Sequence, residues 1–193
     1  MKIILGTIAS IALALPAGAA IIQFDLQGTA GFGLLPGNEP GSIGGGTGGE
    51  IGAGISYDDI LKQLTLNVGW GSSQGFTDLS SASNNAHIHV TANNFGNGGA
   101  GNFTQTGGVA ISLTRSSALA TGGIFTGQPI TLTAPQEADL LNAKYYINIH
   151  TATNGGGEMR GFLTQVPEPS SLGLLALGLT SLTSLRRRKA NAV

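Results

Sequence analysis

Hydrophobic and polar residues alternate along most of the middle of the chain, with the period of two that is typical of β-strands. Ile22, Phe24 and Leu26, for example, are each separated by one polar residue. A strand with this pattern buries one face and exposes the other. The alternation predicts strands over residues 22–27, 51–57, 64–70, 86–91, 109–113, 124–125, 130–132, 145–150 and 158–163. We therefore expect an all-β chain of short antiparallel strands.

The stretch from residue 145 to 163 predicts a β-hairpin. Its first arm places Tyr146, Asn148 and His150 on one face and the hydrophobic residues on the other. Residues 154–157 read Asn-Gly-Gly-Gly, and glycine tolerates the backbone angles of a tight reversal.

Glu158 and Arg160 lie two residues apart on the return arm and share a face. We expect them to form a surface pair or a structural hydrogen-bonding group, worth about 0.2 to 1 kcal/mol, rather than to act in catalysis.

Other segments predict a helix, a loop and a buried tryptophan. Thr133 and Gln136 bracket a proline as at a capped helix start, which predicts one short helix over residues 136–142 with Pro135 at the first helical position. Residues 28–49 are rich in glycine and are expected to form a flexible surface loop. Trp70, the only tryptophan, is expected in the core; the alternative is a ligand-stacking role.

The first 20 residues have the order of a secretory signal peptide. Lys2 precedes an apolar run from Ile3 to Leu15, and small residues follow it. This order predicts export and removal of residues 1–20 by signal peptidase, after Ala19 or Ala20. The alternative is an uncleaved membrane anchor, which the run matches less well because a bilayer span takes about 20 residues.

The tail, residues 166–193, has a different character. Its parts are the motif Val166-Pro167-Glu168-Pro169, a mostly apolar run over residues 172–185, and the basic cluster Arg186-Arg187-Arg188-Lys189. A helix over about residues 171–185 could form a marginal membrane span, with the basic cluster at the cytoplasmic headgroups.

These three parts, in this order, resemble the PEP-CTERM sorting signal. The resemblance implies processing within residues 166–169 by an exosortase after transient attachment to the cytoplasmic membrane. It also implies delivery to the cell surface or the extracellular matrix. The alternative is a permanent single-span anchor without processing.

Charge and cysteine content narrow the possible partners. Between residues 21 and 165, four basic residues against nine acidic ones give a net charge of −5. Nucleic-acid binding needs a basic surface, so we expect no nucleic-acid partner. The chain has no cysteine and therefore neither disulfides nor thiolate metal sites.

All three histidines of the chain lie in two of the predicted strands. His87 and His89 share a face by strand geometry, and His150 shares it if its strand lies beside theirs. Three imidazoles that converge could hold a zinc or copper ion and leave one position open. The alternative is that they hydrogen-bond one another, the backbone or Asn148, and order the sheet.

The His87-Ile88-His89 triplet, the YxNxHT strand from Tyr145 and the G-E-x-R-G segment at residues 157–161 together resemble the CHRD domain, first described in chordin. The resemblance covers residues 22–163 approximately, with a looser match in the middle, and predicts a CHRD domain over residues 21–165. It implies an antiparallel, immunoglobulin-like Greek-key β-sandwich and no settled activity. The expected chain is thus this sandwich with one short helix, flanked by N- and C-terminal hydrophobic targeting helices.

Two hypotheses on function follow. The first is a non-enzymatic surface or matrix protein that contacts exopolysaccharide or envelope proteins, because no nucleophile, base and orienting group are found together in the pattern. The second is a zinc or copper protein that uses His87, His89 and His150. The HxH strand faintly resembles that of copper, zinc superoxide dismutases, although no further histidine remains for their two-metal site.

Overall fold

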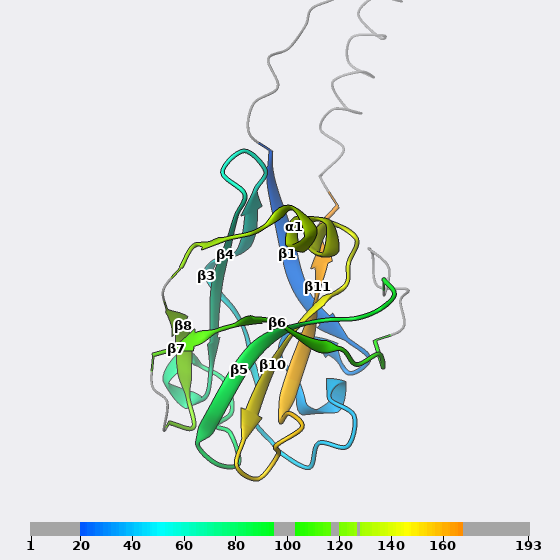
Figure 1. Ribbon diagram of the computed structural model, residues 1–193. Helices are drawn as coiled ribbons and strands as arrows, with labels where there is room; N and C mark the ends of the chain where they lie inside the picture. Colours follow the sequence, from blue (N-terminus) through cyan, green and yellow to red (C-terminus); the bar gives the residue numbers. More distant parts are fainter. Residues whose placement is uncertain (1–19, 95–102, 117–119, 127, 168–193) are drawn as a thin grey trace, which may run out of the picture.

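A computed structural model describes residues 20–94, 103–116, 120–126 and 128–167 (Figure 1). Its strands are β1 (Ile21–Gly28), β2 (Gly31–Phe32), β3 (Gly48–Asp58), β4 (Gln63–Trp70), β5 (Ser83–Val90), β6 (Gly108–Ser112), β7 (Thr114–Arg115), β8 (Gly123–Thr126), β9 (Ile130–Thr131), β10 (Tyr145–Thr151) and β11 (Met159–Gln165). One α-helix, α1 (Ala134–Leu141), and two short 3-10 helices, η1 (Pro36–Asn38) and η2 (Ser72–Gln74), complete the described elements. The expected antiparallel β class with one helix is confirmed within these residues.

The strands form one nearly closed antiparallel sheet. Its order is β6-β5-β10-β11-β1-β3-β4-β8-β7, with β2 paired to β1 and β9 paired to β4. The two strands at the ends of this order, β6 and β7, follow one another in the chain and are joined through Leu113. The sheet therefore curves around until its edges approach. The immunoglobulin-like Greek-key sandwich stays a prediction.

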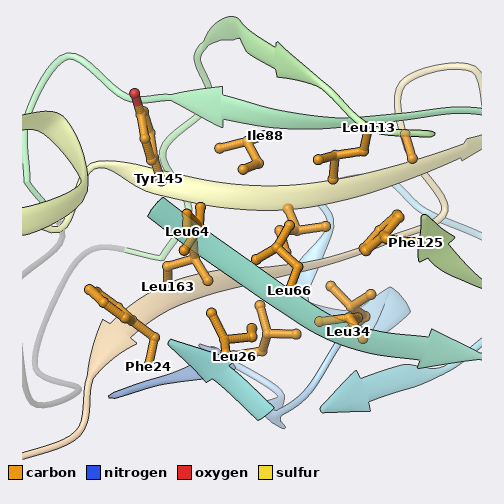
Figure 2. Packing of buried hydrophobic residues seen from close by; sticks show 14 of the residues in the cluster. Phe24, Leu26, Leu34, Leu64, Leu66, Ile88, Leu113, Phe125, Tyr145 and Leu163 are labelled. Carbon is orange, nitrogen blue, oxygen red and sulfur yellow. The ribbon is translucent and has the colours of Figure 1, made fainter. Parts of the chain in front are cut away.

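The hydrophobic face of each strand points into a common core. Ile88 of β5 and Tyr145 of β10 face Leu64 and Leu66 of β4 across this core, and all four side chains are buried (Figure 2). Trp70 is fully buried and packs with its ring 5.1 Å from that of Phe125. The predicted core position of Trp70 is confirmed.

The segment from residue 28 to 49 is not the surface loop that its glycine content predicted. Leu34 is fully buried, and the backbone of Leu35 exchanges hydrogen bonds with that of Arg160 on β11. This close packing needs a glycine on β11, since a Cβ at Gly161 would lie 2.7 Å from the carbonyl oxygen of Gly33. The segment therefore covers the sheet instead of projecting from it.

The helix α1 begins two residues earlier than predicted. Thr133 precedes it with an extended backbone, and its N–H donates to Oε1 of Gln136 at 2.9 Å. This capping contact sets Ala134 as the first helical residue and Pro135 as the second, which lacks only an N–H that no helix needs there.

The predicted targeting helices fall outside the part of the chain that the structure describes, as do residues 1–19 of the signal peptide and the basic cluster. Among the described residues, no helix has the length and apolar character needed to cross a bilayer.

Candidate metal centre

Strand pairing places the three histidines on one face of the sheet. β5 and β10 run antiparallel, with His89 opposite Tyr146, His87 opposite Asn148 and Asn85 opposite His150. His87 and His150 are thus diagonal neighbours across the two strands. The sequence left open whether the strand of His150 lies beside the strand of His87 and His89. In the structure it does.

The imidazole nitrogens converge on one point. One ring nitrogen from each histidine can be chosen so that the three atoms all lie within 4.8 Å of one another. Nδ1 of His87 and Nε2 of His150 are 3.3 Å apart, close to the roughly 3.4 Å between two ligands of a tetrahedral zinc site. To bind a metal ion together with these two nitrogens, the ring of His89 would have to move slightly inward.

Hydrogen bonds to backbone carbonyls fix the orientation of two of the rings. Nδ1 of His89 lies 2.9 Å from the carbonyl oxygen of Gly107, and Nδ1 of His150 lies 3.0 Å from that of Gly155. A carbonyl oxygen can only accept, so Nδ1 carries the proton in both rings and Nε2 presents a lone pair. Metal-binding histidines are usually held in this way.

Nε2 of His89 gives the strongest indication of a bound ion. It is buried, and no described residue forms a hydrogen bond with it. An unpartnered buried acceptor is costly, at about 1 to 3 kcal/mol. The cost would be recovered if a cation occupied the space between the rings.

The local electrostatics favour the neutral form of His87 and His89. Burial lowers the pKa of both His87 and His89, and the neighbouring imidazoles lower it further, while the hydrogen bond to Gly107 partly opposes this for His89. Neutral imidazole is the form that binds metals. These two rings can therefore bind a cation without first losing a charge.

One side of the cluster opens to solvent. A cavity of about 360 Å³ is lined by Asn84, Asn85, His87, His150 and Gly155. His89 lies deeper and does not line it. A metal ion held by the three rings would face this cavity with its remaining coordination position.

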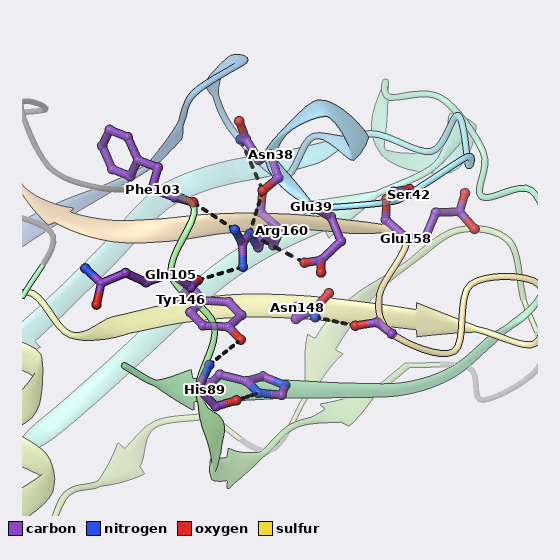
Figure 3. Close-up of polar contacts among 12 residues, drawn as sticks. Asn38, Glu39, Ser42, His89, Phe103, Gln105, Tyr146, Asn148, Glu158 and Arg160 are labelled. Carbon is purple, nitrogen blue, oxygen red and sulfur yellow. Dashed lines mark hydrogen bonds and ion pairs between the residues drawn. The ribbon is translucent and has the colours of Figure 1, made fainter. Parts of the chain in front are cut away.

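Arg160 supports the cluster from the neighbouring strand (Figure 3). Its guanidinium donates to the carbonyl oxygens of Asn38, Gln105 and Phe103 at 2.5, 2.9 and 2.8 Å. It also lies 4.9 Å from the ring centre of Tyr146. Arg160 thereby holds two distant segments, residues 38–39 and 103–107, against the sheet beside the histidines.

Tyr146 connects Arg160 with His89. Its ring stacks on that of His89 at 4.9 Å and an angle of 12°, and its hydroxyl accepts a hydrogen bond from the N–H of Gly107 at 3.2 Å. The carbonyl of the same Gly107 orients His89. This series of contacts, from Arg160 through Tyr146 and Gly107 to His89, was not predicted. Gly107 lies in a stretch rich in glycine and asparagine, whose sequence does not indicate strand pairing.

The expectation of a surface pair between Glu158 and Arg160 is wrong. Both side chains are fully buried. The ionic partner of Arg160 is Glu39, whose Oε2 lies 3.5 Å from Nε. Two segments distant in sequence cover this face of the sheet, which alternation within a strand cannot show. The other alternative, a structural hydrogen-bonding role, fits each residue separately.

Glu158 joins three segments through its carboxylate. Oε1 accepts from the N–H groups of Gly46 and Ser80, and Oε2 accepts from the side chains of Ser80, Thr151 and Asn154. Burial raises the pKa of Glu158, but these hydrogen bonds together outweigh it and hold the pKa below its usual value. The carboxylate stays ionised without a salt bridge within the described residues.

The start of the predicted sorting motif continues from the sheet. The N–H of Val166 donates to the carbonyl oxygen of Gln23 on β1 at 2.9 Å, and Pro167 follows. Glu168 and Pro169 lie outside the described residues.

Comparison with known families agrees with both resemblances. The family model of the CHRD domain matches residues 37–163, and that of the PEP-CTERM protein-sorting motif matches residues 165–189. No curated protein and no solved structure matches the chain. With about two thirds of its length matched by one model, the chain belongs to the CHRD domain family and carries a PEP-CTERM sorting motif after that domain.

Proposed function

We propose that this chain is an exported, exosortase-sorted protein of the cell surface or extracellular matrix whose CHRD domain binds a zinc or copper ion through His87, His89 and His150. The sorting part of the proposal is supported by the PEP-CTERM motif. The metal part rests on one observation: three imidazoles converge, and the deepest of them holds a buried Nε2 without a hydrogen-bond partner among the described residues.

The bound ion would have three neutral imidazole ligands and one open position toward the cavity. Zinc accepts this set in tetrahedral geometry with water or an added ligand as the fourth partner. In the metal-free protein, Nδ1 of His87 donates a hydrogen bond to Nε2 of His150. If Nδ1 bound the metal instead, the proton of His87 would move to its Nε2.

The role at the surface is proposed to be binding rather than catalysis. In the proposed site His87 and His150 are metal ligands, and the rest of the cavity lining, Asn84, Asn85 and Gly155, offers no general acid or base. A ligand from the surroundings, such as an oxygen of an exopolysaccharide or of an envelope protein, could fill the open position. Copper in place of zinc would add the possibility of redox chemistry.

Metal analysis of the purified exported protein tests the proposal. We expect one zinc or copper ion per chain, and little in a variant with His87→Asn, His89→Asn and His150→Asn. At metal concentrations 100 times the dissociation constant, binding adds about 2.7 kcal/mol to folding and raises the melting temperature by roughly 5 to 15 °C.

Asn85→Ala serves as the matched control, since this exposed side chain lines the cavity but is not a proposed ligand. It should keep the metal and the thermal shift. A wild-type chain that takes up no metal, with a melting temperature unchanged by zinc or copper, would contradict the metal part of the proposal.

A further inference from the structure

Both ends of the described chain lie at the same end of the molecule (Figure 1). The first residues of β1 run beside the last residues of β11, with Phe24 opposite Gln165, and Val166 bonds to Gln23. The apolar run of the tail begins at Leu172, seven residues after the last residue of β11. Seven extended residues span at most about 25 Å.

The turn between β3 and β4 lies at this end as well. Ile21 pairs with Asp58. The N–H of Ala20 donates to Oδ1 of Asp59 at 2.9 Å, and the N–H of Asp59 donates back to the carbonyl of Ala20. The turn is thus fastened to the start of β1.

The turn exposes two large aliphatic side chains. Ile60 is 63% and Leu61 is 58% exposed, and Ile21 and Val166 beside them are 45% and 37% exposed. Four of the seven exposed large hydrophobic residues in the described part of the chain therefore gather at this end.

These side chains are not needed to form the turn. Oδ1 of Asp58 accepts the N–H groups of Ile60 and Leu61 at 2.9 and 2.8 Å, which fixes the backbone. Polar side chains would serve there equally well for folding. An exposed aliphatic pair at a turn tip, held outward on a rigid backbone, has the form of an interface anchor.

We propose that this end of the domain rests on a lipid bilayer, with Ile60 and Leu61 inserted at the boundary between headgroups and acyl chains. The inference depends on the proposed function, in that residues 172–185 must first be membrane-inserted. The short connection then keeps the turn within reach of the bilayer, so a weak apolar contact acts at high effective concentration.

The charges at this end indicate which lipid property matters. At the turn, Asp58, Asp59 and Glu137 outnumber Lys62, which pairs with Glu137 at 2.7 Å. An acidic surface gains nothing from anionic headgroups, so contact must come from apolar insertion. Vesicles of neutral phosphatidylcholine should therefore suffice, and added salt should not release the turn.

The experiment uses residues 20–193, the exported chain without its predicted signal peptide, in phosphatidylcholine vesicles; this chain has no cysteine of its own. Ile60→Cys and Leu61→Cys each carry an environment-sensitive fluorophore. We expect blue-shifted emission, with roughly half or more of it quenched by nitroxide lipids that probe about 5 to 10 Å below the headgroups.

Ile43→Cys is the matched control. Ile43 is 84% exposed, and its N–H bonds to Asn154 in the turn between β10 and β11, at the opposite end of the sheet. Its label should behave as in water. Labels at Ile60 and Leu61 that stay water-like on a chain that floats with the vesicles would overturn the inference alone.

Two further outcomes also decide. A chain that fails to float with vesicles would remove the membrane attachment of the proposed function, and the inference with it. Blue-shifted labels that lipid nitroxides do not quench would show a protein contact at this end instead of lipid.

Discussion

Glu158 illustrates at the scale of one residue how a buried charge can be stabilised without an opposite charge. Its carboxylate is fully buried and accepts five hydrogen bonds from donors on three segments. Hydrogen bonds to a charged group are worth about 1.5 to 3 kcal/mol each, and losing one partner exposes the desolvation cost of the other.

Glu158→Gln should therefore destabilise the fold by about 2 to 4 kcal/mol, measured by urea unfolding. The amide keeps the size of the side chain, but it turns an NH₂ group toward donors that need an acceptor. Glu137→Gln is the control, because Glu137 pairs with Lys62 at the surface, where water screens the pair, and the change should destabilise the fold much less. Equal losses in the two variants would refute the assigned role of Glu158.

Alternation within the strands was enough to place His87, His89 and His150 on one face, but it could not show the burial of Glu158 and Arg160. Alternation reports on which side of a sheet a residue lies, and not on what covers that side. Arg160 is covered by residues 38–39 and 103–105, and Glu158 by residues 44–46 and Ser80, all of them far from β11 in sequence.

At the scale of elements, β10 does two jobs with its two faces. Its hydrophobic face, with Ile147 and Ile149, fills the core, and its other face carries His150 and Tyr146. The tyrosine hydroxyl holds Gly107, whose carbonyl orients His89. The strand thus contributes both a ligand and the support of another ligand.

Tyr146→Phe should weaken metal binding about 10- to 100-fold, as expected when a contact behind a ligand is lost. Titration calorimetry with zinc would measure this, and the unfolding free energy would show whether the fold survives. Tyr145→Phe is a close control, since Tyr145 precedes it on the strand and its buried hydroxyl bonds to no described residue. Similar affinities for the two variants would speak against the support role.

The ends of a strand could be predicted from the sequence where the burial of its alternating side chains determines them. β4 (Gln63–Trp70) matches the prediction over residues 64–70 to within one residue, because its alternating residues are the ones that enter the core. β5 begins at Ser83, three residues before the predicted start. There Arg115 bonds to the backbone of Ser83 and Asn84, which only the folded chain can reveal.

The order of strands belongs to the whole molecule and was the least predictable feature. β5 pairs with β10 although about 55 residues separate them, and β1 lies between β11 and β3. Such long-range pairing depends on how all strands fit around one core, so sequence period alone left the position of His150 conditional.

Stability of the whole fold should depend on pH through Glu39. Burial raises the pKa of Glu39 to about 7, and the charge of Arg160 opposes this only in part. The folded chain therefore holds this proton more tightly than the unfolded chain, whose pKa is near 4.5. The contribution of Glu39 is fully present below about pH 4.5 and is lost as the pH rises to about 7.

At 1.36 kcal/mol per pKa unit, the unfolding free energy falls by at most about 3 kcal/mol because of Glu39. Glu39→Gln removes this titration. The unfolding free energy of the wild type minus that of the variant should therefore fall as the pH rises from about 5 to about 7. All other ionisable residues are the same in both chains, so their contributions cancel in the difference. A difference that stays constant across this range would contradict the shift of Glu39.

The near closure of the sheet has a consequence for molecules crowded on a surface. Open strand edges invite pairing with neighbouring copies, which leads to fibres. Here the strands at the ends of the sheet order are short, five residues in β6 and two in β7, and Leu113 joins them directly. Few backbone groups remain there for a second copy to bind, so many chains can be displayed side by side and still remain separate molecules.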